Sequence, residues 1–412
     1  MSTPSSAAPA RAAAHATGKI RPAFVAQAAL IGSALAIYAL ILVQAGLHHQ
    51  DVDAYLAAGR AVWHGQPLYT AFLQHPFPDP TLRPAYIYPP VFALVVAPLA
   101  VLPDAAANVI WLVIGQASLA AALVLVLRWL RPSAWAATAI LCATVTFYPV
   151  WIDAVQGQAN LPILLLVTAG IAGIVRGQPR FAAALGLAAA LKLTPGILLV
   201  WLLLDRRFRE AAWMTGAMAG ITAAAALLRF HDTLVFFGQV LPALSKGTAF
   251  YANQSLAGVV TRIATVNPYT EPWTAVPRVY LLPAILAIAF IGLWFFWTRR
   301  QPPLLRAAAF LPLLPLASSV TWPHHLVILL PVIWFIFIAI AERGWPVRST
   351  IAICALLLLF SVASRWPVGP AFTQPGFRVA QTADPAVFVF ANALFFGTLA
   401  LFLVAPWLLR SR

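Results

Sequence analysis

Acidic residues are scarce in this chain: only 11 of its 412 residues are Asp or Glu. Charged residues of both signs make up 9%, hydrophobic residues make up 62%, and the mean hydropathy is +0.86. A water-soluble fold does not carry a composition this apolar. The sequence therefore excludes a soluble globular protein and predicts an all-α protein that crosses a membrane many times, in which each carboxylate can be weighed individually.

Cysteine and lysine are nearly absent as well. Cys142 and Cys354 lie in separate apolar runs, which argues against a disulfide framework and against a zinc site. Only three lysines accompany 23 arginines, and alanine is abundant, a bias typical of a GC-rich bacterial genome. The net charge of +15 comes from basic residues at the ends of apolar runs, so it suits anionic lipid headgroups and does not indicate a nucleic-acid partner.

Apolar runs dominate the rest of the chain. A membrane span needs about 20 apolar residues, and we count twelve candidate spans: 23–47, 89–103, 106–127, 134–152, 160–176, 181–204, 211–229, 279–298, 304–320, 325–341, 349–364 and 386–409. We interpret residues 1–22 as a disordered cytoplasmic tail before an uncleaved first helix, and residues 23–409 as one transmembrane domain of about twelve helices.

With the N-terminus inside, twelve crossings put four polar segments on the outer face: 48–88, 230–278, 318–325 and 365–385. Most inner turns then carry arginine, as the positive-inside rule asks. The pairs Arg128/Arg131 and Arg176/Arg180 land outside and break that rule. The same topology puts the polar island 153–160 on the inner side.

Two carboxylates, Asp51 and Asp53, lie shortly before Tyr55 in the first outer segment. From Asp51 onward, apolar residues recur every three or four positions, which predicts an amphipathic helix on the membrane surface. Helical spacing places Asp51 and Tyr55 on one face, while Asp53 points elsewhere. On these residues alone, Asp51 is explained by a helix cap, and Tyr88 at the end of the segment is ordinary for a headgroup boundary.

Lys192 is the most unusual polar residue, because it lies inside an apolar run with the helix-breaking Pro195 close behind. A charge inside the membrane is costly and is functional by default, and an ammonium group suits a phosphate or another anion. Gln158 and Asn160 belong to the polar island before it, which on its own is explained by a turn.

Two further outer segments carry candidate polar contacts. Asn253 and Gln254 can donate and accept hydrogen bonds to sugar hydroxyls, and Asn253 also begins a glycosylation sequon. His324 and His325 lie between two spans. Adjacent histidines point apart and no third ligand is near in the sequence, so a metal is the weakest of three interpretations, after an interfacial polar contact and a contact with substrate or phosphate.

Taken in order, these segments resemble the polyprenol-phosphate-sugar-dependent glycosyltransferases of the GT-C superfamily, specifically glycosyltransferase family 87, which includes the actinobacterial mannosyltransferases of phosphatidylinositol mannosides and lipoglycans. The resemblance runs over nearly the whole chain from about residue 25. The stretches that carry it are Asp51-Val52-Asp53-Ala54-Tyr55, Gly65-Gln66-Pro67-Leu68-Tyr69, Tyr88-Pro89-Pro90, Gly157-Gln158-Ala159-Asn160, Lys192 to Pro195, Asn253-Gln254-Ser255-Leu256 and His324-His325.

The resemblance implies an enzyme of the bacterial plasma membrane whose active site faces the extracytoplasmic side. It implies transfer of mannose, with inversion and without a metal or other cofactor, from a polyprenyl-monophosphate donor to a glycolipid or lipoglycan acceptor. Asp51 occupies the position of the general base, and Asp53 is the alternative. Side chains that bind donor or acceptor are then Asp53, Tyr55, Tyr88, Gln158, Asn160, Lys192, Asn253, Gln254, His324 and His325.

Two other functions stay open at this point. Relatives in the family also use a polyprenyl-phosphate-arabinofuranose donor, and the sequence does not choose between the two sugars. A transporter or lipid flippase is the competing class, with a structural membrane protein behind it. The carboxylates favour an enzyme, because several lie in an outer segment, whereas a transporter needs them along its membrane-crossing path. No internal repeat of the kind found in many transporters is visible.

Overall fold

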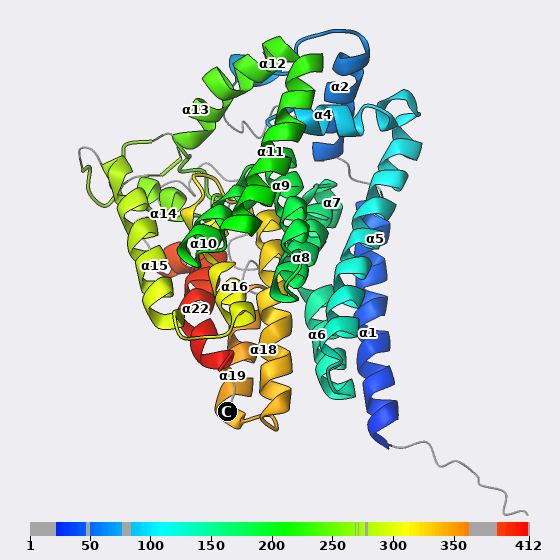
Figure 1. Ribbon diagram of the computed structural model, residues 1–412, viewed down its shortest axis with the longest axis vertical. Helices are drawn as coiled ribbons and strands as arrows, with labels where there is room; N and C mark the ends of the chain where they lie inside the picture. The colour runs from blue at the N-terminus through cyan, green and yellow to red at the C-terminus, as the bar shows by residue number, and fades with distance from the viewer. Residues whose placement is uncertain are drawn as a thin grey trace, which may run out of the picture.

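The structure is a computed structural model that describes residues 22–46, 50–75, 84–267, 269–270, 272–276, 279–361 and 385–410. Within these residues every regular element is a helix, which confirms the predicted all-α membrane fold (Figure 1). Most of the tail expected at 1–22 lies outside the described residues, as does nearly all of the outer segment expected at 365–385. Pro22 is the first residue of helix α1 (Pro22–Ala45).

Four helical segments of the described chain are long and apolar enough to cross a bilayer unaided: α1, α5 (Asp104–Leu130), α11 (Phe208–Leu228) and Pro323–Glu342, which joins η6 (Pro323–Leu329) to α18 (Leu330–Glu342). A fifth candidate is the pair α6 (Ala134–Thr146) and α7 (Tyr148–Gln156), which bends by 46°. Other apolar helices are shorter, so the expected count of twelve is not established by helix length.

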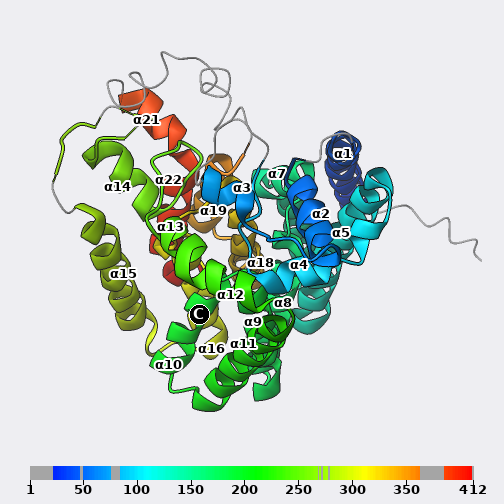
Figure 2. The same cartoon turned by 90° about the horizontal axis from the view of Figure 1, so that it is seen from above.

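Exposure divides these helices into an outer layer and a centre. Helix α1 exposes Phe24, Leu40 and Val43 and buries few residues, as expected of a helix that faces lipid. Helix α18 is almost wholly buried, and Trp334 at its middle donates a 2.8 Å hydrogen bond to Thr144 of α6. Viewed from above, α1 and α5 form one flank of the bundle, whereas α14 (Leu256–Ala264) and α15 (Leu282–Thr298) form the opposite flank (Figure 2).

The first outer segment and the run 89–103 after it fold into short helices at one end of the bundle, namely α2 (Gln50–Trp63), α3 (Thr70–Gln74), α4 (Pro90–Val96) and η1 (Leu99–Val101). The amphipathic helix predicted from Asp51 is α2. Helix α4 has seven residues, about 10 Å of rise, against the roughly 30 Å of a hydrocarbon core. The crossing expected at 89–103 is therefore wrong: much of this run, including Val91, Phe92 and Val96, is buried, and α4 packs against α2.

The loss of that crossing reverses the direction of the helices that follow. Helix α5 begins at the α2 end, spans about 40 Å, and so carries Arg128 to the far end of the bundle. Helices α6 and α7 return, and the turn after α7 touches α2 directly through a hydrogen bond from Gln158 to Asp51. The polar island 153–160 therefore lies beside the first outer segment, which corrects its expected place on the inner side.

The run 181–204 is not one continuous span. After α8 (Asn160–Val175) and η2 (Pro179–Phe181), helix α9 (Ala182–Leu191) runs back to Lys192, whose extended backbone ends it. Then η3 (Thr194–Ile197) and α10 (Leu198–Leu204) lead away to the start of α11. Helix α11 ends beside the α2 end, because Asp232 just after it accepts a hydrogen bond from the backbone N–H of Leu68. The segment is a hairpin whose tip is Lys192.

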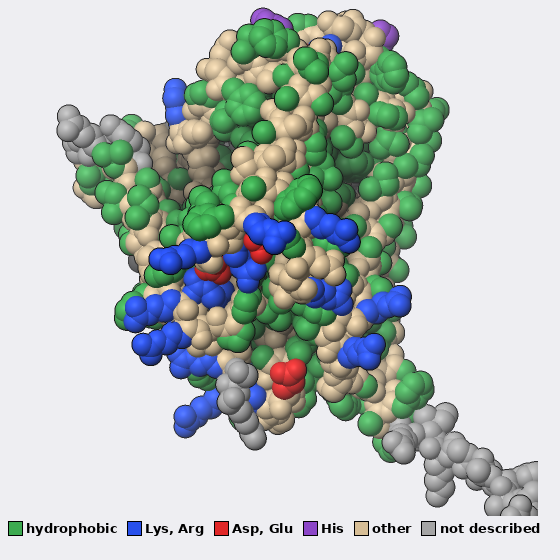
Figure 3. Space-filling model, viewed as in Figure 1, with side chains coloured by type: hydrophobic (Ala, Val, Ile, Leu, Met, Phe, Trp, Pro, Cys, Tyr) green, Lys and Arg blue, Asp and Glu red, His purple; other side chains and the backbone are tan. Residues whose placement is uncertain are grey.

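The C-terminal half completes the bundle around α18. It contains α12 (Phe230–Val235), the π-helical η4 (Phe236–Val240), α13 (Leu241–Ser245), η5 (Val279–Leu281), α16 (Pro303–Phe310), α17 (Leu313–Ala317), α19 (Val347–Leu359), α21 (Pro385–Ala391) and α22 (Ala393–Leu408). Arg306 of α16 forms a buried, two-pronged ion pair with Asp205 after α10. Most Lys and Arg side chains on the face in Figure 3 gather on its lower part, away from α2 and α12.

Candidate active site

The site begins on α2, where Asp51 and Tyr55 stand one turn apart. Tyr55 is buried, Asp51 is half-buried, and Asp53 on the other face is exposed. Acidic residues at the start of a helix are favoured by its dipole, which explains locally why Asp51 and Asp53 lie in the first turn. The structure therefore separates the two carboxylates: Asp51 turns toward the protein interior, and Asp53 toward the surroundings.

A glycine brings the polar island against α2. Gly157 ends α7 with φ +66°, a backbone conformation that other residues adopt reluctantly. A Cβ at this position would lie 2.0 Å from the side chain of Val52, so only glycine permits the close approach. Trp111 of α5 donates a 2.8 Å hydrogen bond to the Gly157 carbonyl and fixes the turn. The next residue, Gln158, is thereby placed beside Asp51.

Gln158 connects Asp51 to two tyrosines. Its Nε2 donates a 2.5 Å hydrogen bond to Oδ2 of Asp51, and its Oε1 accepts from the hydroxyl of Tyr88 at 2.9 Å. The Tyr55 hydroxyl lies 3.1 Å from the same Oε1 and 3.0 Å from the Tyr88 hydroxyl. Because a carboxylate only accepts hydrogen bonds, the amide nitrogen of Gln158 must face Asp51, and the side-chain orientation is determined.

Lys192 extends this chain of contacts from the tip of the hairpin. Its Nζ lies 2.5 Å from Oδ1 of Asn160 and 3.4 Å from the Tyr88 hydroxyl, and 5.3 Å from the centre of the Tyr88 ring. Asn160, the first residue of α8, donates from Nδ2 to Oδ2 of Asp153 at 2.8 Å. We refer to the following connected residues as the polar network: Asp51, Tyr55, Tyr88, Asp153, Gln158, Asn160 and Lys192.

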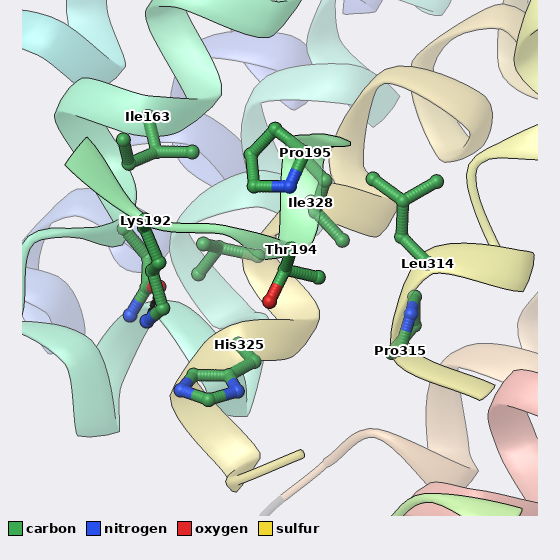
Figure 4. Close-up of a pocket in the computed structure, with 10 residues that line it drawn as sticks. Ile163, Lys192, Thr194, Pro195, Leu314, Pro315, His325 and Ile328 are labelled. Atoms are coloured by element: carbon green, nitrogen blue, oxygen red, sulfur yellow. Dashed lines mark hydrogen bonds between the residues drawn. The ribbon is translucent and has the colours of Figure 1, made fainter. Parts of the chain in front are cut away.

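The two histidines approach this network from η6. Nδ1 of His324 lies 2.6 Å from Oε1 of Gln156, and its Nε2 is buried without a hydrogen-bond partner in the part of the chain that the structure describes. His325 accepts a hydrogen bond from the backbone N–H of Trp322. Together with Lys192, His325 borders a cavity of about 20 Å³, room for roughly one water molecule, and Figure 4 shows both side chains among the residues that line it.

Asn253 and Gln254 lie elsewhere. Both are fully buried, and their amides bond to backbone groups: Asn253 to the carbonyls of Thr248 and Ser319, Gln254 to the carbonyl of Ala391 and the N–H of Phe395. No hydrogen bond among the described residues joins them to the polar network. Their predicted contact with sugars stays a prediction. In the structure their hydrogen bonds connect the second outer segment to the backbone at Ser319, Ala391 and Phe395.

A larger, mainly apolar cavity adjoins the network. It measures about 300 Å³, and Tyr88 and Lys192 lie at its border. The rest of its wall comes mostly from α4, η1, α5 and α8 and is apolar; it includes Val95 and Ile114, which are themselves substantially exposed on the surface of the bundle. The cavity thus joins a cationic group to a flank that faces lipid, an arrangement that suits an anionic headgroup attached to a long hydrocarbon chain.

The electrostatics of Asp51 suit a proton acceptor. Burial raises its pKa from the ordinary 3.8 to about 6, while the hydrogen bond from Gln158 and the charge of Lys192 work in the opposite direction. A base whose pKa lies near the working pH combines a large ionised fraction with useful basicity. In the described residues no group of three His, Cys, Asp or Glu side chains is arranged to hold a metal ion.

Sequence reasoning overlooked two members of this region. Asp153 begins the polar island, which the sequence alone explains by a turn, yet it is almost completely buried and bonded to Asn160. Gln156 of the same island is also absent from the predicted site residues, although it contacts His324. The scarcity of carboxylates is the signal that could have found Asp153, because each of the 11 acidic residues in so apolar a chain can be weighed individually.

Comparison with known proteins finds relatives that cover most of this chain. The chain is 28% identical over 355 residues, covering 82% of it and 80% of the relative, to the polyprenol-phosphate-mannose-dependent alpha-(1-2)-phosphatidylinositol mannoside mannosyltransferase of Mycobacterium tuberculosis. A protein of the same name from Mycolicibacterium smegmatis is 28% identical over 314 residues, 69% of this chain and 68% of the relative.

A third relative, the corresponding phosphatidylinositol pentamannoside mannosyltransferase of Mycobacterium tuberculosis, is 27% identical over 350 residues, covering 79% of this chain and 76% of the relative. No solved structure gives a significant match. The sequence profile of glycosyltransferase family 87 matches residues 86–319, more than half of the chain and most of the polar network. The resemblance seen in the sequence is thus confirmed, and the chain belongs to glycosyltransferase family 87.

Proposed function

We propose that this membrane glycosyltransferase moves mannose from a polyprenyl-monophosphate-mannose donor to a phosphatidylinositol mannoside or a related glycolipid or lipoglycan. The observation that carries the proposal is the polar network itself, which joins a half-buried carboxylate, Asp51, to a cation, Lys192, beside an apolar cavity. The names of the relatives supply the donor and the acceptor class. The proposal includes no nucleic-acid partner.

Asp51 serves as the general base in this scheme. A sugar hydroxyl is a poor nucleophile until a positioned group takes its proton, and Asp51 has a suitable pKa and an amide that holds one of its oxygens. The acceptor oxygen bonds to the anomeric carbon as the bond to the phosphate oxygen breaks, and the proton passes to Asp51. Inversion then converts a β-linked donor into an α-linked product.

Lys192 serves the leaving group. The departing polyprenyl phosphate carries the electrons of the broken bond, and a cation already in place stabilises that charge without reorganisation. His324 and His325 add polar contacts from η6, and the apolar cavity accepts the first part of the polyprenyl chain. Because this division of labour needs no metal, we propose that the reaction proceeds without one.

The pH dependence follows from Asp51. The base acts only when ionised, and its raised pKa of about 6 means that it takes up a proton at a higher pH than an ordinary aspartate. We expect kcat to be constant above about pH 7 and to fall about tenfold per pH unit below pH 6. Activity that stays level down to pH 4.5, measured with protein shown to remain folded there, contradicts the assignment.

We also propose that the active site faces the outer side of a bacterial plasma membrane. With the N-terminus inside, α1 delivers α2 to the outer face, and the hairpin tipped by Lys192 approaches from within the bundle. Arg128, Arg131, Arg176 and Arg180 then fall on the inner face. This topology agrees with the positive-inside rule where the twelve-crossing arrangement did not.

Cysteine labelling tests this topology. In a variant without Cys142 and Cys354, we expect single cysteines at Leu130 and Gln178 to react with a membrane-impermeant maleimide in inverted vesicles and not in intact cells. His64→Cys, exposed on the α2 end, is the matched outer control and reacts in cells. Labelling of positions 130 and 178 in intact cells supports the twelve-crossing arrangement and contradicts the proposed topology, in which residues 181–204 form a hairpin.

A comparison of donors tests the reaction. Purified protein is incubated with phosphatidylinositol mannosides and with either polyprenyl-phosphate-mannose or polyprenyl-phosphate-arabinofuranose, each radiolabelled in the sugar. We expect label from the mannose donor alone, in a product that α-mannosidase releases. Transfer only from the arabinofuranose donor replaces the sugar in the proposal, and transfer from neither moves the protein toward a lipid or solute carrier.

A further inference from the structure

Asp153 is a buried carboxylate to which the proposed reaction gives no part. It is 1% exposed, and among the described residues no basic side chain forms an ion pair with it. An ionised carboxylate in such a place is costly unless hydrogen bonds and nearby charges compensate it. Its direct partners are the side chain and the backbone N–H of Asn160. Tyr38, Tyr55, Tyr88, Asp51 and Lys192 are its other ionisable neighbours.

The partner of Asp153 is also the partner of Lys192. The amide nitrogen of Asn160 donates a hydrogen bond to Asp153 at 2.8 Å, and its amide oxygen accepts one from Lys192 at 2.5 Å. Because a carboxylate cannot donate, Asp153 permits one orientation of the Asn160 amide, the one that turns the oxygen toward the ammonium. An uncharged amide at position 153 would permit both orientations, and one of them turns the Asn160 nitrogen against Lys192.

We infer that Asp153 is a positioning residue, which acts through Asn160 to hold the Lys192 ammonium at the border of the apolar cavity, ready for the phosphate of the polyprenyl donor. The inference rests on the proposed function, since it assigns to Lys192 the phosphate of that donor. Asp153 itself touches neither donor nor acceptor. Its negative charge also offsets the cost of keeping an ammonium inside the bundle.

A purely structural role makes a different prediction. Asp153 lies on α7 and accepts the backbone N–H of the first residue of α8, so it also fastens the start of that helix. If that is all it does, its replacement disturbs the site by the same factor whether or not Lys192 is present. If Asp153 acts through Lys192, its replacement has little left to change once Lys192 is gone. A double-mutant cycle separates the two roles.

The experiment compares wild type, Asp153→Asn, Lys192→Met and the double variant. Each is measured for equilibrium binding of polyprenyl phosphate in detergent and for kcat and KM with polyprenyl-phosphate-mannose. We expect Asp153→Asn to weaken polyprenyl phosphate binding at least tenfold, the effect of about one charge-assisted hydrogen bond, and to change it less than twofold in the Lys192→Met background. Equal factors in both backgrounds, or no effect in wild type, overturn the inference.

Two additions keep the test decisive. Asn160→Ala removes the same link from the other side and carries the cycle with Lys192→Met if Asp153→Asn does not fold. Asp232→Asn is the matched control, because Asp232 is another buried carboxylate but bonds to Arg229 and Leu68, outside the polar network. Its effect, whatever its size, should be the same with and without Lys192.

The binding measurement also distinguishes this inference from the proposed function. Wild type that binds polyprenyl phosphate through Lys192 and Asp153 but transfers no mannose refutes the proposed reaction and leaves the positioning role standing. Transfer of mannose with no coupling between Lys192 and Asp153 supports the proposed reaction and refutes the positioning role.

Discussion

Replacing Asp51 by Asn is expected to lower kcat at least about 100-fold, since general-base catalysis contributes typically 10²–10⁴. Asparagine keeps the shape of the side chain, and its amide oxygen can still accept the hydrogen bond from Gln158. What is lost is the capacity to take a proton from the acceptor hydroxyl. The fold and the KM for donor should therefore change little, and single-turnover measurements should place the loss in the chemical step.

Asp53→Asn is the matched control for this variant. Asp53 lies in the same first turn of α2 but is exposed and forms no hydrogen bond within the described residues. We expect it to retain near-wild-type kcat. If Asp53→Asn loses activity and Asp51→Asn keeps it, the general base is Asp53 and not Asp51. The contact of Asp51 with Gln158 is then structural.

Replacing Lys192 by Met is expected to lower kcat by about 10²–10³, the usual cost of removing one preorganised group that stabilises developing negative charge. Methionine preserves the unbranched apolar stem, so packing in the hairpin should survive. The variant should also bind polyprenyl phosphate more weakly than wild type, because the ammonium is lost from the border of the apolar cavity. Both effects are measured on the same detergent-solubilised preparation.

Lys246 offers the comparison for that variant. It is exposed at the end of α13, outside the polar network, so Lys246→Met should leave kcat and polyprenyl phosphate binding unchanged. A Lys192→Met protein that keeps full turnover shows that the leaving phosphate is stabilised elsewhere, and attention then passes to His324 and His325.

Much of the fold was predictable because the spacing of apolar residues and the positions of helix-breaking residues determine local secondary structure. The spacing of Val52, Tyr55 and Leu56 predicted α2, and Pro195 predicted a break near Lys192. The crossing predicted at 89–103 is wrong because an apolar stretch has the same composition whether it crosses lipid or packs under another helix. Only its burial against α2 distinguishes the two, and burial is a property of the tertiary structure.

The candidate site was predictable to the extent that rare polar residues stand out in an apolar chain. Asp51, Gln158, Asn160 and Lys192 were each identified from the sequence, but their connection was not, because it depends on the close approach of Gly157 to Val52. Asn253 and Gln254 show the opposite difficulty. An amide that satisfies backbone groups in the interior looks, in sequence, the same as one that waits for a sugar.

The most direct test is mannosyl transfer by wild type and Asp51→Asn side by side, from radiolabelled polyprenyl-phosphate-mannose to extracted phosphatidylinositol mannosides, with EDTA present throughout. We expect rapid transfer by wild type, unaffected by the chelator, and a rate lower by at least about 100-fold for the variant. Wild-type activity that EDTA abolishes, or equal rates for the two proteins, contradicts a metal-free reaction with Asp51 as its base.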